Sequence, residues 1–211
     1  MAARKLLLLG ATGPTGQHVV SQALQRGHDV TLLVRDPQRL PDSFRRLRVH
    51  TGSATDESAL GRAVAGQDAV ISTLGVGKSF NPQGLIAGSV PSIIQAMTLH
   101  QVRRLIFMSA YGVGPTIQDV PFVPKLFMRT LLRDVYADKA AGDSALRNSD
   151  LEWTLVHPVT LTNSEATGKY RVGERLALHG FPAISRADVA DFLVKQIDDR
   201  SYVRTSVLVS S

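Results

Sequence analysis

The chain contains no cysteine. Disulfide bonds, thiolate metal sites, iron–sulfur clusters and a cysteine nucleophile are therefore excluded, and a reducing compartment is expected. Long apolar runs are also missing, because the four leucines at 6–9 are followed at once by glycine. Such a run is too short for a signal peptide or a bilayer span, so the sequence predicts a soluble, cytoplasmic protein.

Aromatic residues make up only 6% of the chain, but hydrophobic residues make up 44% and charged residues 20% of its 211 positions. This composition is typical of one globular domain with a sizeable core. Lysine and arginine exceed the acidic residues by 24 to 18, giving a net charge of +6, so an anionic partner is expected. The arginines are scattered without interleaved aromatics or zinc-finger spacing, which favours a phosphorylated small molecule over nucleic acid.

Apolar runs of strand length alternate with stretches of helical period along the whole chain. Strands are expected at 5–9, 30–34, 47–50, 69–74, 104–108 and 153–156, and helices at 15–25, 57–64, 85–100, 136–148 and 187–198. This alternation predicts a single-domain, doubly wound α/β fold, with a parallel sheet and helices on both faces. Substrate-side insertions are expected at about 111–135 and 159–184, the second with a small hairpin around Gly173.

A glycine triplet, Gly10, Gly13 and Gly16, follows the first predicted strand and opens the first predicted helix. Glycine there allows a sharp turn, close approach of the backbone to a pyrophosphate, and tight packing of helix against strand. The helix N-terminus adds free N–H groups and a positive dipole end. The context favours dinucleotide binding over a purely structural turn, and no Gly-Lys-Ser/Thr follows to make a Walker loop.

The end of the second predicted strand distinguishes the two nicotinamide dinucleotides. Arg35 and Arg39 stand where NAD binders usually place a carboxylate on the ribose, and planar guanidinium groups bind phosphate well. NADPH is therefore favoured over NADH. Two alternatives stay open: the arginines merely solvate a surface turn, or Asp36 is the ribose ligand.

Five segments together carry a family resemblance: GATGPTG, LLVRDPQRL, AGQDAVISTLG, LIFMSA and LEWTLVHP. They resemble the atypical short-chain dehydrogenase/reductase family, in its NmrA-like branch, and are similar to biliverdin-IXβ/flavin reductase. The resemblance runs from residue 5 to about 193 and implies a Rossmann-type fold that binds NADPH.

The resemblance also implies which positions contact the cofactor, and one of them departs from the family. Ser53 stands where relatives often have an aspartate that contacts adenine, and no metal site is implied. The expected cofactor residues are Gly10, Ala11, Thr12, Gly13, Pro14, Thr15, Gly16, Arg35, Arg39, Ser53, Ala54, Leu74, Gly75, Met108, Ser109, Lys139 and His157.

The superfamily's Tyr-x-x-x-Lys pair is one residue short here, because Tyr136 precedes Lys139 by only three positions. The family pattern puts Val135 in the tyrosine's place and matches Lys139 to the lysine. Tyr136 is therefore discounted as a proton donor, and Ser109 and Lys139 are the catalytic candidates. Their alternatives are structural: a strand-end cap for Ser109 and an exposed helical lysine for Lys139.

Two further departures concern the end of the sixth predicted strand. Thr160 stands where the biliverdin-reducing branch has a histidine, which disfavours biliverdin itself as substrate. His157 stands where many NmrA-like relatives have arginine, and it is either a cofactor-side group or a hydrogen-bonded structural residue.

The segment between Tyr111 and Val135, which contains the stretch 120–133, is the least similar to the family. Lys125, Arg129 and Arg133 recur at four-residue steps, which indicates an amphipathic helix packed on the domain more than a lid or a surface for a partner or membrane.

The sequence thus predicts an NADPH-dependent reductase of a flavin-, quinone- or tetrapyrrole-like acceptor. FMN or FAD would enter as substrate rather than as bound cofactor. The alternative is a non-catalytic, NmrA-like protein that senses NADP(H), whereas an epimerase or dehydratase is disfavoured. A monomer or weak homodimer is expected.

Overall fold

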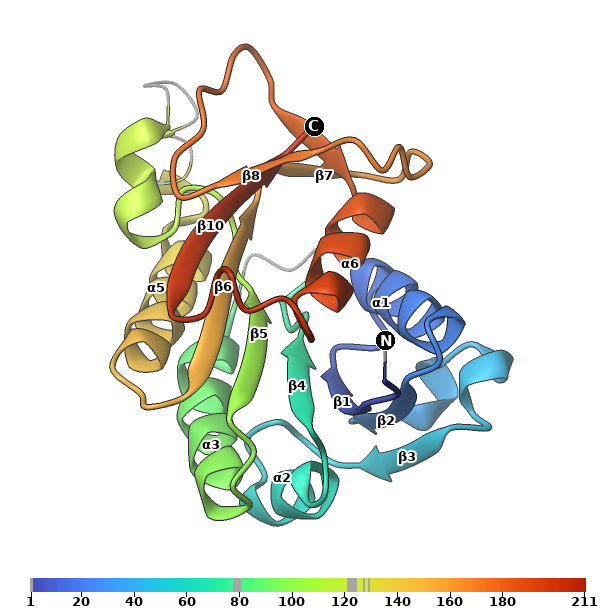
Figure 1. Cartoon of the computed structure of the whole chain (residues 1–211). Helices are drawn as coiled ribbons and strands as arrows, with labels where there is room; N and C mark the ends of the chain where they lie inside the picture. Colours follow the sequence, from blue (N-terminus) through green and yellow to red (C-terminus); the bar gives the residue numbers. More distant parts are fainter. Residues whose placement is uncertain (1, 78–80, 121–124, 127, 129) are drawn as a thin grey trace.

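The computed structural model describes residues 2–77, 81–120, 125, 126, 128 and 130–211 (Figure 1). Within these residues the main sheet has eight strands in the order β3-β2-β1-β4-β5-β6-β10-β8. All neighbouring strands are parallel except β8, which is antiparallel to β10. The strands are β1 (Lys5–Leu9), β2 (Asp29–Val34), β3 (Arg48–Thr51), β4 (Ala69–Ser72), β5 (Arg104–Met108), β6 (Glu152–Pro158), β8 (Arg171–Gly173) and β10 (Thr205–Ser210).

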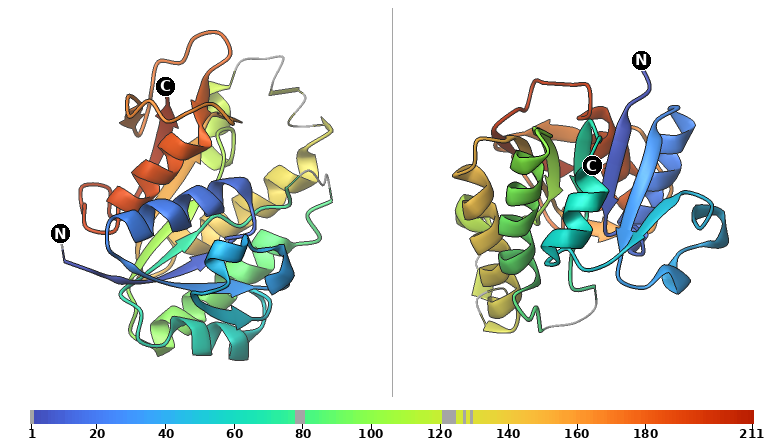
Figure 2. Two further views of the ribbon diagram at one scale, coloured as in Figure 1. Left: turned by 90° about the vertical axis from the view of Figure 1, so that its right-hand side faces the viewer. Right: turned by 90° about the horizontal axis from the view of Figure 1, so that it is seen from below.

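Helices cover both faces of this sheet, as the two further views make plain (Figure 2). One face carries α1 (Pro14–Gln25) and α6 (Arg186–Lys195), and the other carries α2 (Glu57–Val64), α3 (Leu85–Leu99) and α5 (Arg133–Arg147). Short 3-10 turns form η1 (Pro37–Arg39), η2 (Asp42–Phe44) and η3 (Gly114–Asp119), and β7 (Thr160–Thr162) pairs in parallel with β9 (Ala183–Ser185).

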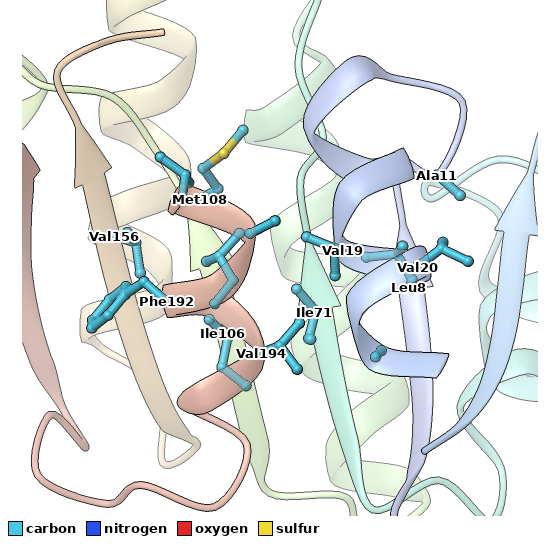
Figure 3. Close-up of a cluster of buried hydrophobic side chains, with 14 of the residues drawn as sticks. Leu8, Ala11, Val19, Val20, Ile71, Ile106, Met108, Val156, Phe192 and Val194 are labelled. Atoms are coloured by element: carbon cyan, nitrogen blue, oxygen red, sulfur yellow. The ribbon is translucent and has the colours of Figure 1, made fainter. Parts of the chain in front are cut away.

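The core is divided in two by the sheet because successive strand residues point to opposite faces. In β1, Leu6 and Leu8 belong to the cluster under α1 and α6, whereas Leu7 and Leu9 belong to the cluster under α2, α3 and α5. Figure 3 shows the first cluster, with side chains of α1 and α6 meeting those of the central strands. The continuous apolar run of β1 is thus explained by burial on both faces.

The predicted doubly wound α/β architecture is confirmed, and β1, α2 and β5 have the predicted bounds. The expected hairpin around Gly173 is wrong. Arg171–Gly173 pairs with β10, whose outer edge would otherwise leave backbone groups unpaired. Of the predicted helix at 120–133, Lys125, Leu126, Met128 and Thr130 are helical, while Arg129 lies outside the described residues.

Across the part of the chain that the structure describes, every helix falls short of the length and apolar character that crossing a bilayer requires.

Candidate functional site

The turn after β1 is built by two glycines that have no room for a side chain. Gly10 has a φ of +91°, and a β-carbon on it would come 2.7 Å from Oγ1 of Thr73. A β-carbon on Gly16 would come 2.2 Å from the carbonyl oxygen of Gly10. Helix α1 therefore packs directly against the strand ends from which the turn leaves.

The N-terminus of α1 is left open by this turn. Gly13 is its N-cap residue without a side-chain hydrogen bond, Pro14 follows, and the first turn contains no acidic residue. The unpaired amide groups and the positive end of the helix dipole therefore face outward without neutralisation, an arrangement that binds anions such as phosphate.

A cavity of about 260 Å³ opens beside this helix end. It lies over the carboxyl ends of β1, β2, β3 and β4, where the order of strands reverses between β1 and β4. Ligands in open parallel sheets bind at this switch point. The predicted residues that line the cavity are Gly10, Thr12, Gly13, Pro14, Arg35, Arg39, Ser53, Ala54, Leu74 and Gly75.

Two exposed guanidinium groups, those of Arg35 and Arg39, stand at the β2 end of the cavity. Asp36 lies between them in sequence but does not line the cavity, and its Oδ1 accepts a hydrogen bond of 2.9 Å from the backbone N–H of Gln38. This bond caps η1. The corner of the cavity next to β2 is therefore positively charged.

Ser53 lines the same cavity, with its hydroxyl 2.8 Å from that of Thr55. Its Oγ also accepts a hydrogen bond of 3.2 Å from the N–H of Thr55. The side chain is thus part of the turn that leads to α2.

The other predicted residues lie outside the cavity. Ala11, Thr15 and Gly16 are buried in the turn and the first turn of α1. Met108, Ser109, Lys139 and His157 belong to a second group, at the adjacent carboxyl ends of β5 and β6 and on α5.

The second group is organised around Asp143 of α5, which is fully buried. The Ser109 hydroxyl donates a hydrogen bond of 2.9 Å to its Oδ2, and Nε2 of His157 lies 3.8 Å from the same oxygen. Nδ1 of His157 is 3.0 Å from the carbonyl oxygen of Ala110, so this nitrogen carries the ring proton of the neutral imidazole. We name Ser109, Asp143 and His157 the buried triad.

Burial governs the ionisation of the buried triad. It raises the pKa of Asp143 to about 6, against the hydrogen bond from Ser109 and the charges of Arg147 and Lys139, which lower it. It lowers the pKa of His157 to about 4, although the hydrogen bond to Ala110 acts in the opposite direction. Both groups are therefore neutral at a pH between about 4 and about 6, where the 3.8 Å contact between them is not an ion pair.

Lys139 lies one helical turn before Asp143 and is partly exposed. Burial lowers the pKa of its ammonium group, while the charges of Asp143 and Asp138 raise it. Asp138 itself reaches across to α3, where its carboxylate accepts hydrogen bonds from the N–H groups of Ile86 at 3.0 Å and Ala87 at 2.9 Å. One turn of α5 therefore fixes both the start of α3 and the end of β5.

Among the described residues, the hydroxyl group of Tyr136 bonds to the backbone and not to the buried triad. Its hydroxyl donates a hydrogen bond of 3.3 Å to the carbonyl oxygen of Tyr111, and burial raises the pKa of this phenol. The ring borders a separate hollow of about 350 Å³ that Met128 and Arg133 also line.

Comparison with known proteins agrees with this geometry. Residues 10–200 match the family model described as NAD(P)H-binding. The chain belongs to the NAD(P)H-binding family. The predicted resemblance to NmrA-like, atypical short-chain dehydrogenases is confirmed at this level, whereas the biliverdin-IXβ/flavin reductase branch stays a prediction.

The proteins that resemble the chain in sequence include reductases. The chain is 28% identical over 190 residues to a (4-alkanoyl-5-oxo-2,5-dihydrofuran-3-yl)methyl phosphate reductase of Streptomyces griseus, and the alignment covers 88% of the chain and 59% of that protein. It is 26% identical to an uncharacterized chloroplastic protein of Arabidopsis thaliana, covering 92% of the chain and 72% of that protein. The chain thus spans only part of the length of these relatives.

Solved structures share the fold over the whole chain. A short-chain dehydrogenase/reductase of Veillonella parvula in complex with NADP superposes with a TM-score of 0.82 at 23% identity, covering 100% of the chain and 95% of the other.

Three residues of this region that the family pattern did not single out matter to its geometry. Thr73 closes the glycine turn by donating a hydrogen bond of 3.2 Å to the carbonyl oxygen of Leu9. Asp138 and Asp143 hold α5 to its neighbours. The four-residue spacing of Lys139 and Asp143, which puts both on one helix face, was the signal available in the sequence.

Proposed function

We propose that this NAD(P)H-binding protein is an NADPH-dependent reductase that transfers hydride to a flat conjugated acceptor of flavin, quinone or tetrapyrrole type. The observation that carries the cofactor choice is the pair Arg35 and Arg39 at the β2 end of the cavity, with Asp36 committed to capping η1.

The residues around the cavity fit a dinucleotide phosphate. The open N-terminus of α1 and the backbone of Gly13 would hold the pyrophosphate, and the two guanidinium groups would hold the 2′-phosphate. Leu74 and Gly75 would border the cofactor on the way to the end of β5. NADPH, when bound, supplies the hydride.

The contacts of Tyr136 favour a flavin- or quinone-like acceptor over an alcohol or ketone substrate. Alcohol dehydrogenation in the superfamily needs a tyrosine acid, and here the Tyr136 hydroxyl is bonded to a backbone carbonyl and borders another hollow. Reduction of a flavin or quinone asks less of the protein, namely stacking of the acceptor and one proton. The reductases among the sequence relatives support the reductive direction.

The decisive experiment is a titration of NADPH and NADH against wild type, Arg35→Ala and a control, Arg46→Ala. Arg46 is also an exposed arginine, but it does not line the cavity. Loss of a 2′-phosphate contact costs roughly 1.5 to 3 kcal/mol, so Arg35→Ala should weaken NADPH binding about ten-fold or more. NADH binding and the Arg46→Ala variant should stay at wild-type affinity.

Steady-state oxidation of NADPH with FMN, FAD, small quinones and biliverdin then tests turnover. Absence of oxidation with all of them would contradict the reductase and favour the second candidate, a protein that senses NADP(H). One observation supports that candidate: Ser109 is only 3% exposed, and its hydroxyl group donates its hydrogen bond to Asp143. A sensor would bind oxidised and reduced cofactor with different affinity and turn neither over.

A further inference from the structure

The buried triad has a shortage of hydrogen-bond donors. Among the described residues, Oδ1 of Asp143 and Nε2 of His157 are both buried without a hydrogen-bond partner. The ring proton of His157 is committed to Ala110, so its lone pair, not a proton, faces the carboxyl group. Ser109 is then the one donor that an ionised Asp143 has within hydrogen-bond distance in the described chain.

A carboxylate that is desolvated and accepts a single hydrogen bond is costly, and the group lowers this cost by keeping its proton. The charged groups acting on it are Lys139 and Arg147, both on its own helix. On the other elements packed around it, β5 contributes the neutral Ser109, β6 the neutral His157, and α3 has no ionisable side chain. The two cations only partly offset burial.

We infer that Asp143 stores the proton for reduction of the acceptor and delivers it through the hydroxyl group of Ser109. This inference rests on the proposed function and supplies the proton source that Tyr136 does not provide. Asp143 supplies the proton, and Ser109 passes it to the acceptor. Asp143 thus acts through Ser109 and is a positioning residue.

The 2.9 Å contact between Ser109 and Asp143 works in both directions. When Oδ2 carries the proton, it donates to Oγ of Ser109, and the serine proton is free to point toward the acceptor. As the acceptor takes the hydride of NADPH, the Ser109 O–H bond breaks and a new bond to hydrogen forms on the acceptor. The Asp143 O–H bond breaks in turn and restores the serine hydroxyl.

The carboxylate left by this step takes a proton from water. In this proposal the proton would pass along Lys139, which lies one turn earlier on the same face of α5 and is partly exposed. The balance is one hydride from NADPH and one proton from water for each acceptor reduced, and no further reactant is needed.

The test compares wild type with Asp143→Asn, which still accepts a hydrogen bond from Ser109 but has no proton to give. Asp150→Asn is the matched control, because Asp150 is exposed next to the C-terminal end of α5. We expect Asp143→Asn to lower kcat roughly 100-fold, with the Kd for NADPH unchanged and Asp150→Asn at wild-type rate.

The pH profile separates proton storage from a merely structural role. Wild-type kcat should fall as pH rises through about 6, the pKa of Asp143, and this limb should be absent from Asp143→Asn. Ser109→Ala should lose a similar factor, and the double variant should lose no more than either single one, because the two groups act as one unit. An Asp143→Asn variant with wild-type kcat and an intact limb would overturn the inference.

Infrared difference spectroscopy between about pH 5 and about pH 8 reads the stored proton without any acceptor. A carboxylic-acid band that disappears at the higher pH and is missing from Asp143→Asn supports proton storage; its absence from wild type overturns it. If wild type reduces no acceptor, the proposed function fails, and proton delivery to the acceptor fails with it. The kinetic assay reports this failure, whereas the infrared spectrum reports proton storage by Asp143 independently. If acceptors are reduced equally by both proteins, the inference alone fails.

Discussion

The carbonyl oxygen of Gly10 occupies the space that a side chain on Gly16 would need, 2.2 Å from the position of its β-carbon. Backbone, not a flexible side chain, makes this contact, so the first turn of α1 cannot yield without moving the strand end. The turn that approaches the cofactor and the packing of α1 on the sheet are therefore one feature.

Gly16→Ala is expected to destabilise the protein by about 1 to 3 kcal/mol, the usual cost of overpacking, and to weaken NADPH binding. Urea denaturation and a cofactor titration measure the two effects. Gly88→Ala is the matched control, since Gly88 is also helical but its β-carbon would meet only Cγ2 of Thr55 at 3.5 Å. That variant should be as stable as wild type or up to about 1 kcal/mol more stable; equal stability of Gly16→Ala would contradict the packing argument.

The carboxylate of Asp138 should support both the stability of the fold and the shape of the cavity. It accepts hydrogen bonds from two backbone N–H groups at the start of α3. The N-cap residue of that helix, Gly84, has no side chain that could accept them. Asp138→Asn can satisfy only one of them, at a cost of roughly 1 to 3 kcal/mol. Since Leu85, at the same helix end, lines the cavity, NADPH affinity should fall as well.

Thermal denaturation and NADPH titration of Asp138→Asn and Asp150→Asn side by side check this prediction. Asp150 is exposed, so its variant should match wild type in both measurements. Loss of stability with unchanged affinity would show that the start of α3 does not shape the cavity.

The elements that sequence predicts best are those whose own residues determine them. The buried leucines of β1 and the helix 57–64, with Asp56 capping its start, have the bounds that their patterns indicate. The three-residue strands β7, β8 and β9 are too short to show a period, and they form because neighbouring backbone edges need partners. β10 pairs in parallel with β6 from the far end of the chain.

The same division applies to the site. The glycine turn and the arginines after β2 are local in sequence, so their meeting in one cavity follows from strand order. The contacts Ser109–Asp143 and Ile86–Asp138 join residues 34 and 52 positions apart, and they depend on how α5 rotates against β5 and α3. No periodicity in the sequence reports that rotation.

The segment between β7 and β8 should lose its hydrogen bonds to α6 after a single substitution at Asp188. This buried carboxylate accepts hydrogen bonds from the N–H groups of Thr167 and Gly168 and from the hydroxyl of Ser185. Although burial raises its pKa, these bonds lower the pKa on balance. Asp188→Ala leaves the two N–H groups unpaired, so we expect faster cleavage by a broad-specificity protease between 163 and 170.

Mass spectrometry of the fragments locates the cleavage, and Asp150→Ala, at an exposed position after α5, is the control. Cleavage elsewhere, or at the wild-type rate, would show that the segment is held by other contacts.

The buried pair Asp143 and His157 should impose opposite pH dependences on stability. Burial raises the pKa of Asp143 from 3.8 to about 6, so its contribution is complete below 3.8 and is lost as pH rises through about 6. Burial lowers the pKa of His157 from 6.5 to about 4, so its contribution is complete above 6.5 and is lost as pH falls through about 4. Each amounts to roughly 3 kcal/mol at about 1.4 kcal/mol per unit, and in wild type they nearly cancel.

Single substitutions should therefore reveal slopes of opposite sign between about pH 4 and about pH 6. The free energy of unfolding of Asp143→Asn should rise with pH, because only the effect of His157 remains. That of His157→Asn, which keeps an N–H for Ala110, should fall with pH, because only the effect of Asp143 remains. Urea denaturation at a series of pH values measures both slopes; slopes of the same sign would contradict the argument that burial shifts the two pKa values in opposite directions.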